Sequence, residues 1–263
     1  MHTSPLLAAL FAIATAWAQT GDWESAHSKA AQALAGLSNQ EKAGLVTGVG
    51  WMNGPCVGNT GSADSIGFRS LCLQDGPLGI RMAHPVTAFP AGIQAASTWD
   101  VDLIEQRGAA MGEEARGLGV NVLLGPVAGA LGKIPQAGRN WEGFSPDPYL
   151  AGIAMQHSIQ GTQGVGVQAC AKHYIGNEQE RNRESMSSNI DDRTMHELYL
   201  WPFADAVKAD VASFMCSYNR LDGTFACEND HILNELLKDE LAFQVCPPAN
   251  RTTTCFPQSS FGC

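Results

Sequence analysis

Polar side chains of complementary types recur near one end of the apolar, β-prone segments of this chain. Asp75 closes the first segment, Lys172 and His173 lie near the end of a later one, and Tyr218 lies near the end of the last. Carboxylates and cations can bind neighbouring hydroxyl groups, and an aromatic ring such as Tyr218 or Trp141 can cover the C–H face of a sugar. If the fold gathers these residues, they predict a pocket for a polyol.

Each of these residues taken alone has a structural explanation. Asp75 begins an Asp-Gly-Pro sequence that is typical of turns. Arg139 lies close enough to Glu142 for a solvated ion pair, which would be worth little. A single histidine such as His173 is more often structural than catalytic, and Met215 would ordinarily belong to a core. Only the combination of carboxylate, cations, imidazole and aromatic rings favours a binding site.

Two kinds of apolar periodicity alternate along the chain and define the elements that must position these residues. Continuous apolar runs predict buried strands at 70–75, 120–127, 165–174 and 211–219. Apolar residues at helical spacing predict helices at 100–119, 148–163, 191–210 and 229–244. Asn229 is the expected N-cap of the last helix, and Ser38 with Glu41 forms the signature of a capping box that opens another helix upstream.

Strands that alternate with helices at intervals of roughly 45 residues predict an α/β fold with parallel strands. Continuous rather than alternating apolarity indicates that both faces of the sheet are covered. A doubly wound sheet and a (β/α)8 barrel both satisfy this pattern. The polar residues follow the strands at their carboxyl ends, which converge on one face of a barrel. This placement favours the barrel.

Composition makes several classes of function improbable. The chain has 263 residues, of which 44% are hydrophobic, and a formal net charge of −10. The negative charge leaves no basic face for nucleic acid or an anionic membrane, so neither is predicted as a partner. There is no Walker loop, G-x-S-x-G elbow or His-Glu-x-x-His, and the spacing of Cys and His is not that of a zinc site. No cofactor and no metal is predicted.

The N-terminus has the pattern of a secretory signal peptide at 1–18. An apolar run covers 6–17, and small residues stand at Ala16 and Ala18, the two positions that a signal peptidase reads. The run is shorter than the about 20 apolar residues that a membrane span needs. We predict cleavage after Ala18 and secretion to the extracellular space, where disulfides can form.

The chain contains eight cysteines. Cys56 and Cys72 flank a loop rich in glycine and serine, and Cys216 and Cys227 flank a shorter loop. Each pair could close its loop, but the sequence leaves the connectivity open. Cys170 lies in an apolar run and is predicted to be a buried free thiol.

Five stretches together point to a known family. They are "LCLQDGPLGIR", "GPVAGALGKIPQAGRNWEGFSPDPYL", "AKHYIGNEQE", "DDRTMHELYLWPFADAV" and "MCSYN". In this order and spacing, the chain from about 23 to 244 resembles the N-terminal domain of fungal β-glucosidases of glycoside hydrolase family 3. The resemblance implies a TIM-like barrel, followed in the family by an α/β sandwich domain and usually a fibronectin-like domain. It also implies retaining hydrolysis of terminal, non-reducing β-D-glucosyl units, as in cellobiose and short cellodextrins.

The resemblance also implies roles for individual residues. Asp75 would hold the distal hydroxyls of glucose, Lys172 and His173 would donate to neighbouring ones, and Arg139 would orient the ring. The full set implied to contact glucose is Asp75, Arg81, Arg139, Lys172, His173, Met215 and Tyr218.

Two further expectations come from the same resemblance. The family's disulfides in this region would correspond to Cys56–Cys72 and Cys216–Cys227. The stretch "KHYIGNEQE" differs from the "KHFPGHGD" of members that act on N-acetylglucosaminides and take an acid–base dyad from this loop. The difference favours the glucosidase branch.

The chain departs from the family pattern after Gln244. Members continue with a "GFVMSDW"-like strand that carries the nucleophile, whereas 245–263 is an unrelated tail rich in cysteine and proline. Retaining hydrolysis needs a nucleophilic carboxylate and an acid about 5 to 5.5 Å apart. We therefore expect residues 19–244 to form an incomplete (β/α)8 barrel that hydrolyses no glycoside and, with an open strand edge, folds poorly.

Three interpretations stand at this point. The leading one is part of a family 3 β-glucosidase that stops before the nucleophile strand, with Glu142, Glu178 and Glu184 as ion-pairing residues rather than replacements. The alternative is a secreted, non-catalytic glucose-binding remnant. A barrel enzyme of another class would require all five stretches to coincide by chance.

Overall fold

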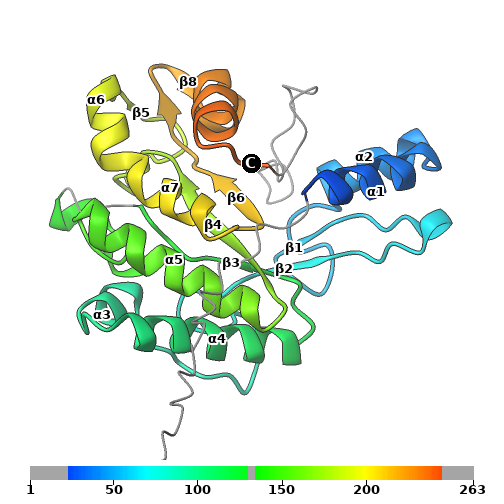
Figure 1. Cartoon of the computed structure of the whole chain (residues 1–263), viewed down its shortest axis with the longest axis horizontal. Coiled ribbons are helices and arrows are strands. Elements are labelled where there is room, and N and C mark those ends of the chain that lie inside the picture. Colours follow the sequence, from blue (N-terminus) through cyan, green and yellow to red (C-terminus); the bar gives the residue numbers. More distant parts are fainter. Residues whose placement is uncertain (1–22, 130–133, 245–263) are drawn as a thin grey trace, which may run out of the picture.

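The computed structural model describes residues 23–129 and 134–244 (Figure 1). The signal peptide predicted at 1–18 and the tail at 245–263 lie outside these residues. None of the described helices is long and apolar enough to span a bilayer.

A five-stranded sheet forms the centre of the fold, in the order β1-β2-β3-β4-β6. β1 pairs with β2 antiparallel, and all the other neighbours are parallel. The strands are β1 Gly58–Asn59, β2 Cys72–Asp75, β3 Val122–Leu124, β4 Gln168–Tyr174 and β6 Ser213–Cys216. Each of the four predicted strands is present, although shorter than its apolar run, and they lie side by side as an incomplete TIM-like barrel.

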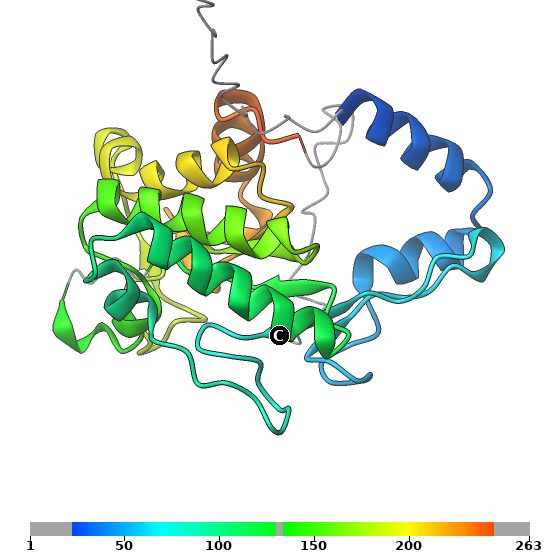
Figure 2. The same cartoon turned by 60° about the horizontal axis from the view of Figure 1, so that its bottom comes forward.

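Helices α4, α5 and α7 run along one face of this sheet, as both views show (Figures 1 and 2). α1 and α2 lie to the other side, away from this layer. The α-helices are α1 Trp23–Ala35, α2 Asn39–Thr47, α3 Gly92–Ala96, α4 Val101–Gly117, α5 Pro148–Gly164, α6 Asp192–Thr194 and α7 Trp201–Lys208. The wider π-helical segments are η4 Met195–Tyr199 and η6 His231–Glu240, and the 3-10 turns are η1 Asp64–Ile66, η2 Pro135–Ala137, η3 Asn140–Glu142 and η5 Ala226–Glu228.

Local sequence explains where several helices begin. The capping box before α2 is confirmed, because the Ser38 hydroxyl accepts from the Glu41 amide and Glu41 bonds back to the Ser38 amide. α4 and α5 start after Asp100 and Asp147, whose carboxylates accept amides of the first turn. Pro148 follows as the first residue of α5, where a missing amide is tolerated.

The segment 191–210 is helical, as predicted, but the helix is irregular. The segment is divided into α6, η4 and α7. Pro202 lies at the start of α7, where it lacks the amide that would bond back to the previous turn, and the widened turns precede it. The last helix is also shorter than predicted and begins after Asp230, although the Asn229 side chain still accepts a first-turn amide.

Apolar side chains lie on both faces of the sheet, as the continuous apolar runs predicted. Towards α4, the core includes Leu123 and Met111, and on the opposite face Leu73, Val122 and Leu124 form a separate cluster. The largest cluster joins β4 and β6 to the helices and contains the aromatic rings of Tyr174, Phe203, Phe214 and Phe243. Cys170 is a buried free thiol, as predicted.

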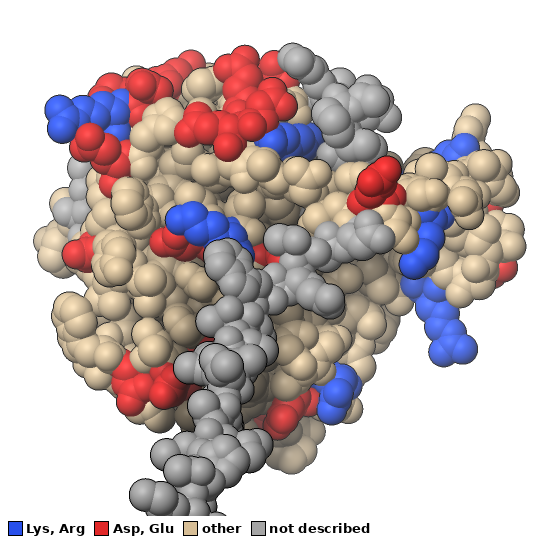
Figure 3. All heavy atoms as spheres, viewed as in Figure 1, with Lys and Arg blue, Asp and Glu red and all other residues tan. Residues whose placement is uncertain are grey.

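A second, small sheet lies outside the central one and was not predicted. Its strands are β5 Ser187–Ser188, β7 Arg220–Leu221 and β8 Thr224–Phe225. In the face of the molecule shown in Figure 3, acidic side chains gather at the edge near α6 and η6, in keeping with the net charge of −10.

Candidate sugar-binding site

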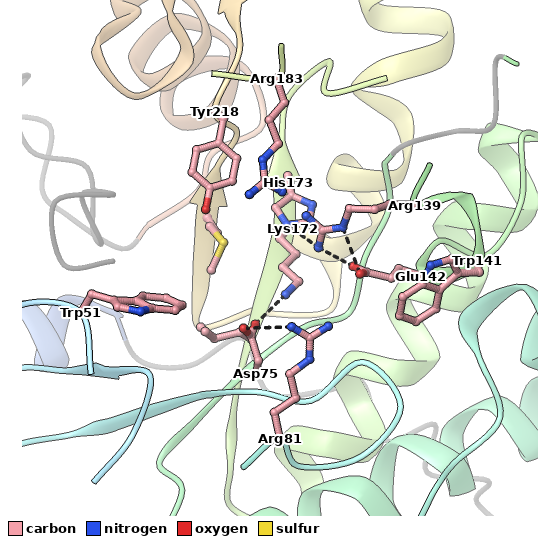
Figure 4. Close-up of a pocket in the computed structure, with 12 residues that line it drawn as sticks. Trp51, Asp75, Arg81, Arg139, Trp141, Glu142, Lys172, His173, Arg183 and Tyr218 are labelled. Atoms are coloured by element: carbon pink, nitrogen blue, oxygen red, sulfur yellow. Dashed lines mark hydrogen bonds and ion pairs between the residues drawn. The ribbon is translucent and has the colours of Figure 1, made fainter. Parts of the chain in front are cut away.

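A pocket of about 380 Å³ opens at the carboxyl ends of the parallel strands (Figure 4). Its volume lies within the range of small-molecule sites. All seven residues expected to contact glucose line it. The complete lining is Trp51, Asp75, Arg81, Leu124, Arg139, Trp141, Glu142, Lys172, His173, Arg183, Met215 and Tyr218.

Asp75 and Lys172 form an ion pair at the floor of the pocket. The Lys172 Nζ donates to Asp75 Oδ1 at 3.1 Å, and the lysine side chain is only 3% exposed. Arg81 lies on the other side of the carboxylate, with its Nη1 3.7 Å from Oδ2, and is half exposed. Asp75 is 19% exposed, so one acceptor group stays accessible between two cations. Such a carboxylate is well placed to accept hydroxyl protons.

Arg139 and Glu142 form a second ion pair, and the interpretation of this pair as solvated is wrong. The arginine donates from Nε and Nη2 to the two carboxylate oxygens at 3.0 and 2.6 Å, and the Glu142 side chain is 2% exposed. Burial alone would lower the pKa of Arg139, but the hydrogen bonds and charge of Glu142 raise it. Breaking a buried pair of this kind costs about 3 to 5 kcal/mol. The pair therefore fixes the arginine within the pocket wall.

His173 is buried between these two ion pairs and is neutral. Burial, followed by the charges of Lys172 and Arg139, lowers its pKa well below the usual range, although a hydrogen bond with the Gly129 backbone opposes the shift. The Nη2 of Arg139 lies 3.4 Å from the His173 Nε2. Because a guanidinium only donates, Nε2 is the accepting nitrogen in this contact.

An irregularity in β4 places two consecutive residues at the pocket. Side chains of a regular strand alternate between faces, but the pairing of β4 with β6 shifts register between Lys172 and Tyr174. Lys172 and His173 both line the pocket. Tyr174 instead enters the core, where its hydroxyl donates to the Ile232 carbonyl at 2.8 Å.

Two disulfides hold segments that reach the pocket, and both expected pairings are confirmed. Cys216–Cys227 closes the loop that carries Tyr218, directly after β6. Cys56–Cys72 ties the segment after Trp51 to the start of β2. Both aromatic residues are thus held close to strands of the central sheet.

Three lining residues were missed by the sequence analysis. Trp51 lies across the charged cluster from Trp141, and its glycine-rich surroundings suggested only a loop. The Arg183 guanidinium stacks 4.5 Å from the centre of the Tyr218 ring and bonds to Glu180 at 2.8 Å. Leu124 ends β3 and completes the floor. The position of Trp51 just before the loop closed by Cys56–Cys72 was the available signal that this residue reaches the pocket.

The buried neutral histidine leads to a prediction about pH. An unfolded chain binds a proton at His173 below about pH 6.5, whereas the folded pocket excludes it until much lower pH. Stability should therefore fall as pH decreases below 6.5, by at most about 1.4 kcal/mol per pH unit for this one proton. Urea unfolding at a series of pH values should show a shallower fall for His173→Gln.

His196 provides the matched control. Its hydrogen bonds to the Asp192 backbone and to Glu240 raise its pKa, so it stabilises the fold at low pH and loses this effect as pH rises. His196→Gln should therefore steepen the fall in stability on acidification. An unchanged slope in His173→Gln would contradict the assignment of a buried neutral imidazole.

Comparison with known proteins places the chain. Residues 64–245 match the glycosyl hydrolase family 3 N-terminal domain. The chain is 68% identical over 222 residues to the probable beta-glucosidase L of Aspergillus terreus, covering 84% of this chain and 30% of that protein. The beta-glucosidase cel3A of Pyricularia oryzae is 61% identical over 243 residues, 92% of this chain and 34% of that protein. The chain thus spans about a third of the length of these curated relatives.

Solved structures give the same result. The beta-D-glucoside glucohydrolase of Trichoderma reesei superposes with a TM-score of 0.82 at 63% identity, over 84% of this chain and 31% of that one. Beta-glucosidase 3B of Thermotoga neapolitana, solved in complex with alpha-D-glucose, superposes with a TM-score of 0.78 at 36% identity, over 82% and 33%. The fold, its strand-end pocket and these matches agree, and the chain belongs to glycosyl hydrolase family 3, of which it carries the N-terminal domain.

Proposed function

We propose that this chain supplies the glucosyl-binding part of a secreted family 3 β-glucosidase. The reaction would be retaining hydrolysis of terminal, non-reducing β-D-glucosyl units of cellobiose and short cellodextrins, in cellulose degradation. The observation that carries the proposal is the convergence of two buried ion pairs, Asp75–Lys172 and Arg139–Glu142, on one pocket of about 380 Å³. The two disulfides and the relatives named beta-glucosidase support secretion and the glucoside class.

The pocket offers separate partners for separate parts of the sugar. The Asp75 carboxylate would accept from two neighbouring distal hydroxyls, and the Lys172 ammonium beside it would donate to the oxygen of a third. Arg139, fixed by Glu142, would orient the ring from the other wall. The indole of Trp141 and the ring of Tyr218 would cover apolar C–H faces. Charge-assisted hydrogen bonds on one edge and aromatic cover on the faces fit a neutral hexose.

The pocket binds sugar in this proposal but does not cleave it by itself. Within the described residues, the carboxylates that line the pocket are Asp75 and Glu142. Asp75 is held by Lys172 and Glu142 is bidentate to Arg139, so neither is available as a nucleophile. A retaining mechanism needs one carboxylate to form the glycosyl-enzyme and another to protonate the leaving oxygen. We propose that neither of these groups belongs to the pocket described here.

A non-catalytic glucose-binding role for the chain alone is the second candidate. It is favoured by the arrangement of the pocket, where every residue expected to contact glucose is already in place. The two candidates share the binding step and differ in whether other carboxylates complete the site.

Glucose binding by the 263-residue chain is the first expected result. Isothermal titration with glucose should give saturable heat, and Lys172→Met should weaken the affinity roughly 10- to 100-fold, because a charged donor is lost and Asp75 loses its partner. Lys208→Met is the matched control, since the Lys208 side chain is 68% exposed, pairs with Asp205 and does not line the pocket. Equal affinities in the two variants would refute the assignment of the pocket.

Hydrolysis is expected to be absent from the same preparation. A chromogenic aryl β-glucoside should be turned over no faster by the chain than by its Lys172→Met variant, because the lining carboxylates are both ion-paired. Turnover that Glu178→Gln abolishes would overturn this expectation and would identify a catalytic carboxylate in the 175–178 segment.

A further inference from the structure

The loop 76–91 determines one wall of the sugar pocket and has little structure of its own. It leads from Asp75 at the end of β2 to the start of α3 and carries Arg81 on the way. Among its residues there is no helix and no strand of the central sheet. A long loop without secondary structure keeps a fixed shape only if other elements hold it.

Arg107 of α4 bonds to both ends of this loop. Its Nη2 donates to the Pro77 carbonyl at 2.7 Å, and its Nε donates to the Pro90 carbonyl at 2.8 Å. Pro77 is only two residues beyond Asp75, so the first bond fixes the chain where it leaves the sugar-facing carboxylate. The guanidinium thus bridges the loop across its base.

The charge of Arg107 is directed to backbone oxygens rather than to a carboxylate. The structure records no salt bridge for it among the described residues, and burial lowers its pKa to about 10. It stays protonated near neutral pH. A partly buried arginine that bonds to two carbonyls indicates a fixed geometry, because its planar fork must point at both oxygens simultaneously.

Glu114 holds the same loop at its middle. Its Oε1 accepts from the Thr87 amide at 2.7 Å. Glu114 lies seven residues after Arg107, so two helical turns place both side chains on one face of α4. On the strand side, the Arg81 amide bonds to the Asp75 carbonyl and the Gln74 side chain donates to the Arg81 carbonyl, each at 2.9 Å. The loop is therefore clamped between β2 and α4.

α4 is itself a rigid support. It crosses α5 at glycines so closely that a Cβ on Gly161 would lie 2.2 Å from the Glu105 carbonyl oxygen, and one on Gly108 2.6 Å from the Ser158 carbonyl oxygen. The Thr162 hydroxyl also donates to the Gly108 carbonyl at 3.2 Å. Gly108 follows Arg107 directly, so the close crossing fixes the helix backbone at the base of the guanidinium.

Arg107 also lies behind the second ion pair of the site. It lines a small cavity of about 20 Å³, together with Pro77 and Glu142. One side of this cavity is the loop that follows Asp75, and another is the carboxylate that holds Arg139. Arg107 therefore shares this cavity with the loop after Asp75 and with the carboxylate that holds Arg139.

We propose that Arg107 is a positioning residue of the sugar pocket, which acts through the loop 76–91 to set the orientation of Asp75 and Arg81. This inference rests on the proposed glucose-binding function for its ligand, but not for its structural part. Arg107 itself does not line the pocket. Its effect is on the geometry of residues that do.

The matched test compares two arginines of the same helix. Arg107→Met should weaken glucose binding, measured by isothermal titration of the full chain, roughly tenfold or more, because two charge-assisted bonds to the loop are lost. Arg116→Met should leave the affinity within about twofold, since Arg116 is exposed, lies far along α4 and, within the described residues, bonds to the Val165 carbonyl alone at 3.2 Å. Arg107→Lys should restore part of the affinity, because a lysine can reach one of the two carbonyls.

Amide hydrogen exchange without sugar separates this inference from the proposed function. Peptides covering 77–90 should exchange faster in Arg107→Met than in the wild type, with exchange in β3 and β4 unchanged, and Arg116→Met should resemble the wild type. If the wild type binds no glucose, the proposed function fails, and the exchange result alone decides the inference. If Arg107→Met does not fold, Arg107→Lys replaces it, and exchange of the 77–90 peptides should be accelerated by a smaller factor. The positioning role of Arg107 would be overturned if exchange in the loop were unchanged in Arg107→Met. It would also be overturned if exchange were accelerated equally throughout the sheet.

Discussion

The contact between Lys172 and Asp75 is the constraint on which the rest of the site depends. The aspartate ends β2, the lysine lies near the end of β4, and β3 lies between these strands in the sheet. A buried ammonium is unfavourable unless a partner is present, so the fold must bring the carboxylate of β2 within reach of the lysine of β4 across β3. In the parallel register Asp75 lies opposite Leu124 and Ala169 lies opposite Leu123, so Lys172 lies further along β4 than the level of Asp75 and its long side chain spans the offset. The 3.1 Å contact between Lys172 Nζ and Asp75 Oδ1 thus depends on the order of the strands, on their length and on the helices that cover the sheet.

Support for the pocket comes in successive layers of the fold. The lining charges are paired with each other, the loops that carry them are pinned by disulfides and by α4, and α4 is fixed by its close crossing of α5. His173 stays neutral because burial, together with the charges of Lys172 and Arg139, lowers its pKa.

Local periodicity was sufficient to predict the four parallel strands, the two long helices α4 and α5, and the side of the sheet on which the polar residues gather. It was insufficient wherever the outcome depended on distant contacts. Arg139 and Glu142 looked like a surface pair because spacing alone carries no information about burial. Trp51 comes from a glycine-rich loop with no periodic signal, and the small sheet of β5, β7 and β8 consists of strands of two residues each. Apolar spacing indicated the helix at 191–210, but it carries no information about the widened turns that precede Pro202.

The central claim is that Asp75 and Lys172 are interdependent across the sheet, and a double-mutant cycle measures this directly. The free energies of unfolding of the wild type, Asp75→Asn, Lys172→Met and the double variant would be determined by urea denaturation. Each single variant leaves a buried charge without its main partner, whereas the double variant leaves none. The account predicts a coupling energy of at least about 1 kcal/mol, with the double variant more stable than the sum of the single effects implies. Additivity to within about 0.5 kcal/mol would contradict it.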